Sequence, residues 1–95
     1  MKKTFHIGPG WALGFDELQW IPRKAVLSGM KTHWKPVGYI GGRKSLLMRV
    51  LRENKAVIDS EGQELLDSLP DTFKEWLKAF KSGQWVSPQV IKEAA

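Results

Sequence analysis

The sequence predicts an α+β fold in which a small antiparallel sheet of three to four strands packs against two to three helices. Apolar and polar side chains alternate through much of residues 3–40, and glycine and proline separate the alternating runs, as between short strands. After residue 43, apolar side chains instead recur every three or four positions, which is typical of one face of a helix. A chain of 95 residues is expected to form a single domain, residues 1–95.

The strands are predicted from short runs in the first half of the chain. Alternating or apolar runs occupy residues 3–7, 11–15, 18–21, 25–27 and 30–40. Turns are expected at Gly8-Pro9-Gly10 and at Ser28-Gly29, where the residue types favour chain reversal. Because proline cannot donate to a strand ladder, we expect Pro22 at a strand end or edge and Pro36 at a bulge or edge.

The first helix is predicted over residues 43–54, after a Gly41-Gly42 hinge that follows a strand at residues 37–40. Its apolar stripe consists of Leu46, Leu47, Val50 and Leu51. The stripe is expected to face the sheet, because an amphipathic helix buries its apolar side. The exposed face of this helix then carries Arg43, Lys44, Arg49 and Arg52.

Two further helices are predicted in the second half. One opens at Asp59-Ser60, where Ser60 and Gln63 have the spacing of a capping box. The other follows Pro70, with Ser68 and Asp71 as possible caps; its apolar positions are Phe73, Trp76, Leu77 and Phe80. Gly83 is expected to end it. Residues 84–95 form a tail that either docks through Trp85 or stays loose, with Val90 and Ile91 in a last helical turn.

The composition excludes several classes of function. The chain has no cysteine, so it has no disulfide, no thiolate nucleophile and no cysteine-ligated metal. His6 and His33 lack metal-ligand spacing, and we predict no enzymatic activity, no catalytic residues, no metal and no cofactor. No apolar run approaches the roughly 18 residues that a membrane span needs, and the N-terminus lacks the features of a signal peptide. The protein is therefore expected to be soluble and cytoplasmic, without a membrane partner.

One phosphate-binding pattern is nearly present. Residues 38–45, GYIGGRKS, match the G-x-x-x-x-G-K-[ST] loop except that Arg43 replaces its second glycine. That glycine lets the backbone wrap a phosphate closely, so nucleotide hydrolysis is not predicted. The free amides at the start of this helix, beside Arg43 and Lys44, can still hold a single phosphate or carboxylate.

Charge is distributed unevenly along the chain. The net charge is +5, but residues 1–55 hold eleven Lys or Arg against three acids, whereas residues 56–95 hold four against seven. This asymmetry favours a face that attracts phosphate. Trp34, between His33 and Lys35, is expected to stack on a base or sugar, although most of the five tryptophans should lie in the core. The candidate nucleic-acid-binding residues are Arg23, Lys24, Lys31, Trp34, Lys35, Arg43, Lys44, Arg49 and Arg52.

Two segments, FDELQWIPRK and WKPVGYIGGRKSLLMRVLRE, give the chain a resemblance to small accessory proteins encoded by tailed phages and prophages. The resemblance spans about residues 11–52 and carries no catalytic motif. It implies an accessory role in phage biology, in the host cytoplasm, and supplies no active residues.

Three hypotheses follow. The first is a non-enzymatic protein that contacts a nucleic-acid backbone through a basic hairpin-plus-helix face. The second is a phage-type inhibitor or adaptor that binds a host protein, as anti-CRISPR or anti-restriction proteins do, with tryptophans as anchors. The third is a structural subunit of a homo-oligomer, with Trp85 or Trp34 buried between copies.

Overall fold

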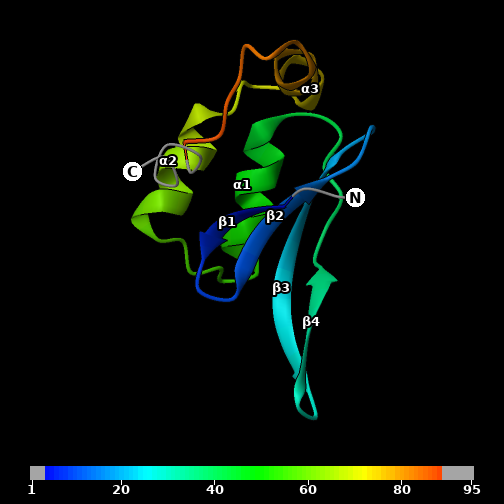
Figure 1. The fold of residues 1–95 in the computed structure, drawn as a ribbon, viewed down its shortest axis with the longest axis vertical. Helices are drawn as coiled ribbons and strands as arrows, with labels where there is room; N and C mark the ends of the chain where they lie inside the picture. The colour runs from blue at the N-terminus through cyan, green and yellow to red at the C-terminus, as the bar shows by residue number, and fades with distance from the viewer. Residues whose placement is uncertain (1–3, 89–95) are drawn as a thin grey trace.

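The computed structural model describes residues 4–88 and confirms the α+β fold. Its strands are β1 (Thr4–Gly8), β2 (Trp11–Phe15), β3 (Trp20–Ser28) and β4 (Lys31–Pro36), and its helices are α1 (Lys44–Glu53), α2 (Ser60–Ser68) and α3 (Phe73–Ser82). The strands pair antiparallel in the order β1-β2-β3-β4, so neighbours in sequence are neighbours in the sheet. Figure 1 shows α1 crossing behind the sheet, α2 beside β1, and α3 at the end of the molecule opposite the β3–β4 turn.

Strand alternation divides the sheet into a covered face and an open face. Phe5 lies opposite Leu13, and Leu13 lies opposite Pro22, so these side chains share the face that the helices cover. All three are buried. Ala12 and its partner Arg23 lie on the other face, which we call the open face. The helices therefore bury one side of β1, β2 and the first part of β3.

Aromatic side chains dominate the core between the sheet and α3. Trp76 is fully buried, and its ring centroid lies 4.8 Å from that of Phe15, 5.1 Å from Phe80 and 5.4 Å from Trp85. Aromatic pairs at such separations add to the free energy gained from apolar burial. The predicted period of the third helix is thus confirmed, since Phe73 and Trp76 are buried and Phe80 packs against them.

Trp85 packs the segment after α3 against the body of the domain. Its indole Nε1 donates hydrogen bonds to the backbone oxygen of Ser68 at 3.2 Å and to its hydroxyl at 3.1 Å, while its ring contacts Phe5. Residues 84–88 are therefore held against the body of the domain. The rest of the predicted tail, with the turn containing Val90 and Ile91, lies outside the described residues.

Pro22 departs from its predicted place at a strand end or edge. It is fully buried inside β3, a strand with neighbours on both sides. The Pro22 carbonyl accepts from the N–H of Val37, so the proline nitrogen also faces Val37, just beyond the end of β4 at Pro36. The N–H that proline lacks would have pointed toward Val37, so its absence removes no hydrogen bond between β3 and β2. Pro36, the last residue of the edge strand β4, is where the sequence predicts it.

Two details around α1 are also corrected. The strand predicted over residues 37–40 is reduced to a single bridge between Ile40 and Trp20. Leu47 and Leu51 are buried as predicted, but Leu46 is exposed. The buried face of α1 is therefore narrower than the apolar stripe in the sequence.

The caps of the last two helices differ from the predicted ones. The α2 cap is Asp59, whose side chain accepts from the N–H of Gly62, rather than Ser60. The α3 cap is Thr72, whose hydroxyl accepts from the N–H of Glu75. Gly83 ends α3 as predicted, with a left-handed φ of 80°.

The approach of α2 to β1 requires a glycine. A Cβ atom added to Gly62 would lie 1.8 Å from the backbone oxygen of Ile7, so helix and strand touch through their main chains. The N–H of Asp59 donates to that same oxygen, which anchors the start of α2 on the sheet.

We expect Gly62→Ala to destabilise the domain by about 2 kcal/mol or more, because the new methyl forces strand and helix apart. Alanine favours a helix more than glycine does, so propensity alone predicts the opposite sign. Gly42→Ala is the control, since nothing lies within 4 Å of its added Cβ. Urea unfolding followed by circular dichroism measures both; an unchanged or raised midpoint for Gly62→Ala would contradict the close approach.

Candidate nucleic-acid interface

Strands β3 and β4 continue past the rest of the sheet as a two-stranded ribbon. Pairing between β2 and β3 ends at Lys24, opposite Trp11. Beyond it, residues 25–28 pair with residues 31–34, and one further bond, from the Ala25 N–H to the Gly10 oxygen at 2.9 Å, ties the start of this segment to the β1–β2 turn; we call residues 25–34 the ribbon. Figure 1 shows the ribbon projecting at one end of the molecule, away from α2 and α3. Gly29, the first residue of its two-residue turn, has a φ of 64°, as a type II′ turn requires.

The ribbon and its base carry positive charge without neighbouring acids. Residues 18–52 contain no Asp or Glu. The cations at or beside the ribbon are Arg23, Lys24, Lys31 and Lys35. Within residues 4–88, ion pairs join His6 to Asp59, Arg49 to Glu53 and Lys81 to Glu17, so none neutralises a cation of this group. These four charges are available to an external anion.

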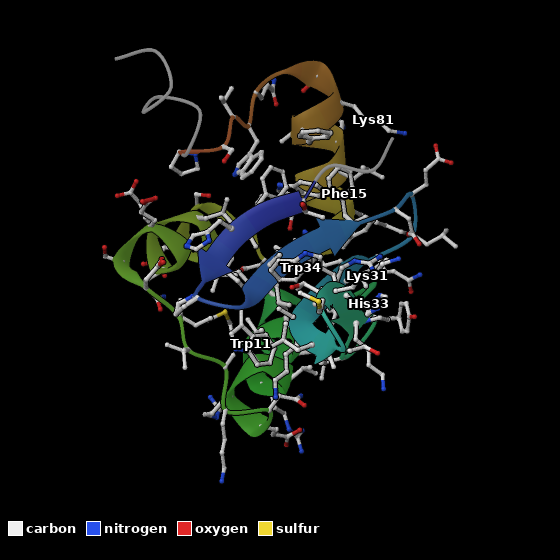
Figure 2. All side chains as sticks on the ribbon, turned by 60° about the horizontal axis from the view of Figure 1, so that its bottom comes forward. Trp11, Phe15, Lys31, His33, Trp34 and Lys81 are labelled. Carbon is white, nitrogen blue, oxygen red and sulfur yellow. The ribbon has the colours of Figure 1, made fainter. Side chains whose placement is uncertain are left out.

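Alternation places the charged and aromatic residues of the ribbon on different sides. Lys24 pairs with Lys35, and these share a face with His33 and Lys31. Trp34 pairs with Ala25 on the other side, which continues the open face of the sheet. Figure 2 shows Lys31 and His33 on one side of the ribbon and Trp34 on the other.

The helical residues of the predicted site have local partners or surroundings within the domain. The ammonium of Lys44 donates to the backbone oxygens of Leu69 at 2.8 Å and Leu66 at 3.4 Å, at the end of α2. Arg49 pairs with Glu53 one turn along α1. Arg52 lies in the last turn of α1, where the helix dipole favours a cation.

At the start of α1, where the sequence predicts an anion site, one amide is occupied and acidic side chains lie nearby. The Lys44 N–H donates to the backbone oxygen of Asp71 at 2.7 Å, so an amide expected to be free is occupied. Arg43 lines a pocket of about 490 Å³ together with Asp71 and Glu75, whose carboxylates oppose anion binding. In Figure 1 this end of α1 lies beside α3, at the far end of the molecule from the ribbon tip. Five of the nine candidate residues lie together on β3 and β4: Arg23, Lys24, Lys31, Trp34 and Lys35.

Sequence reasoning missed the apolar tip of the ribbon. Leu27 is 76% exposed and Met30 is fully exposed. The apolar run at residues 25–27 is visible in the sequence, but it looks like a buried strand. It is exposed because β2 pairs with β3 only as far as Lys24, and the length of that pairing becomes known only with the fold.

A pair of titratable side chains outside the ribbon has a structural role. The Asp59 carboxylate accepts from His6 Nε2 at 2.5 Å and from the N–H of Gly62 at 2.7 Å. An ionised carboxylate can only accept, so the imidazole is the donor. The bond from His6, followed by that from Gly62, lowers the pKa of Asp59 below its usual 3.8. The pair ties β1 to the start of α2.

This lowered pKa predicts a stability contribution that depends on pH. Because the folded pKa is depressed, ionised Asp59 stabilises the fold above about pH 3.8, and its contribution is lost as the pH falls through the folded pKa. Asp59→Asn keeps a capping side chain but removes the charge. Thermal unfolding from pH 7 to pH 2 should show a melting-temperature deficit that shrinks in acid. Glu64→Gln, an exposed change on α2, is the control; a deficit that stays constant with pH would contradict the assignment.

Trp34 should be the accessible fluorophore of the protein. It is 47% exposed, whereas the other four tryptophans are 8% exposed or less. We expect acrylamide to quench one component of the native emission, and Trp34→Phe to lose that component. Stern–Volmer plots of both proteins, native and in guanidinium, make the measurement. An accessible component that persists in Trp34→Phe would show that another tryptophan is exposed.

None of the helices within residues 4–88 has the length and apolar character needed to cross a bilayer. In the same residues, His, Asp and Glu side chains form no cluster of three that suits a metal ion. Comparison with known protein families, curated proteins and solved structures finds no significant match to this chain.

Proposed function

We propose that the protein binds nucleic acid through the ribbon and the adjoining part of the sheet. The observation that carries the proposal is a projecting ribbon that, together with its base, holds four cations without an ion-pair partner within residues 4–88, in an acid-free stretch of chain. Each cation that neutralises a phosphate releases counterions, which supplies affinity without reading sequence. The ribbon projects from the body, so a polyanion can approach it from several sides.

The charge of the second half of the chain supports an oriented approach. Residues 56–95 carry more acids than bases, and those of them that form α2 and α3 lie away from the ribbon. A polyanion is attracted to one end of such a molecule and repelled from the other, which steers the encounter. The basic face of the proposal is therefore the hairpin alone, without the start of α1.

A protein partner is the second candidate function, and the apolar ribbon tip favours it. Leu27 lies just before the ribbon turn and Met30 lies within it, and both side chains are exposed. Exposed apolar residues are common anchors of protein interfaces. This candidate corresponds to a phage-type inhibitor or adaptor. Stoichiometric capture of a host protein from a nuclease-treated lysate, with no affinity for oligonucleotides, would favour it over nucleic acid.

The proposal predicts that removing ribbon charge weakens binding and its salt dependence together. Lys31→Gln with Lys35→Gln should lower affinity for a labelled oligonucleotide at low salt. It should also reduce the slope of log affinity against log salt by about 0.7 to 0.9 for each phosphate that is no longer neutralised. Fluorescence anisotropy between 50 and 200 mM salt, roughly the range over which phosphate neutralisation is most visible, is the measurement.

Lys74→Gln with Lys78→Gln is the matched control, because it removes the same charge from exposed positions on α3. It should leave the salt slope near that of the wild type. Equal losses in the two variants would mean that only net charge matters. Failure of the wild type to bind at micromolar concentration, or binding indifferent to salt, would overturn the proposal.

A further inference from the structure

A shallow pocket lies on the open face of the sheet, where the ribbon joins it. Its volume is about 400 Å³, and it is lined by Thr4, Ala12, Arg23 and Trp34. These residues come from β1, β2, β3 and β4 in turn, so the pocket spans the sheet. Its volume falls within the range of roughly 300 to 1,000 Å³ that small-ligand sites occupy.

Small residues on β2 make room for this pocket. Ala12 is buried beneath it, and Gly14 leaves space that a side chain would fill. The Nε atom of Arg23 lies 3.1 Å from the position that a Cβ atom on Gly14 would take. The Arg23 side chain therefore lies across the open face over Gly14, where a larger residue would lift it away. Its guanidinium has no carboxylate partner within residues 4–88.

The indole of Trp34 lines the pocket together with Arg23. The other four tryptophans are buried in the core, whereas Trp34 is about half exposed. The pocket thus combines an exposed aromatic plane with an unpaired guanidinium across small residues. An aromatic plane suits stacking with a nucleobase, and a guanidinium either donates to a base edge or stacks on a base.

We propose that this pocket takes one unpaired nucleobase, so that the ligand of the protein is single-stranded nucleic acid rather than a duplex. The inference rests on the proposed function and adds its substrate class. A base within a duplex is stacked on its neighbours and paired at its edge, and its plane is not accessible to Trp34.

The test compares single-stranded oligothymidylate with a duplex of equal length, using the full chain. Tryptophan emission reports stacking, because Trp34 is the exposed fluorophore. We expect the single strand to quench the emission and to bind more tightly than the duplex. Trp34→Leu should abolish the quenching and weaken single-strand binding about ten-fold, the order of one base–aromatic stack. Its salt slope and its duplex affinity should stay unchanged.

Three further variants separate stacking from charge and from folding. Tyr39→Leu removes an exposed aromatic side chain outside the pocket and should leave binding unchanged. Trp34→Phe keeps an aromatic plane and should restore part of the affinity that Trp34→Leu loses. Arg23→Lys keeps the charge but loses the planar fork, so it should lower single-strand affinity several-fold at a constant salt slope.

The outcomes distinguish the two proposals. Salt-dependent binding without preference for the single strand, or without an effect of Trp34→Leu, overturns the base pocket and leaves the proposed function standing. Absence of binding to both probes overturns both. Equal weakening by Trp34→Leu and Tyr39→Leu would also overturn the pocket, because it would show a general loss of exposed aromatic surface.

Discussion

The packing of aromatic rings around Trp76 is the interaction on which the rest of the structure depends. Rings from β1, β2, β3, α3 and the segment after α3 meet there, with Phe15 and Trp85 among them. A chain of this size buries a modest fraction of its surface, so a few large side chains must supply most of the burial. Because they gather on one face and at one end of the sheet, the opposite face and the far end remain uncovered.

The edge strand β4 carries residues that suit its protection as well as the proposed function. An edge strand with unpaired backbone groups invites pairing with other chains, and lysine and proline on that edge oppose it. Lys31, Lys35 and Pro36 of β4 fit this protective role as well as the recognition of an anion. Protection alone does not explain Trp34 or the apolar tip at Leu27 and Met30, since exposed apolar surface promotes association.

The basic residues of the first half divide according to their surroundings. Lys44 contacts carbonyl oxygens at the end of α2 and so links α1 to α2, and Arg49 pairs with Glu53 one turn along α1. The hairpin cations have no such neighbours because residues 18–52 lack acids and the helices do not reach the ribbon. A cation of the first half is thus occupied within the domain, or left available to an external anion, according to whether an acceptor oxygen lies beside it.

The sequence by itself determined the fold class, the strand and helix segments and the burial of most aromatic residues. Local patterns such as the alternation of Phe5 and Ile7, or the spacing of Phe73 and Trp76, express the period of a single element. Tertiary structure decided the site. Whether Lys44 faces solvent or the end of α2, whether Pro22 lies inside the sheet, and how far β3 outruns β2 depend on how distant segments pack together. Residue spacing carries no record of that packing, so the sequence predicts one basic face from hairpin and helix, whereas Lys44 contacts the end of α2 and Arg43 lies beside Asp71 and Glu75.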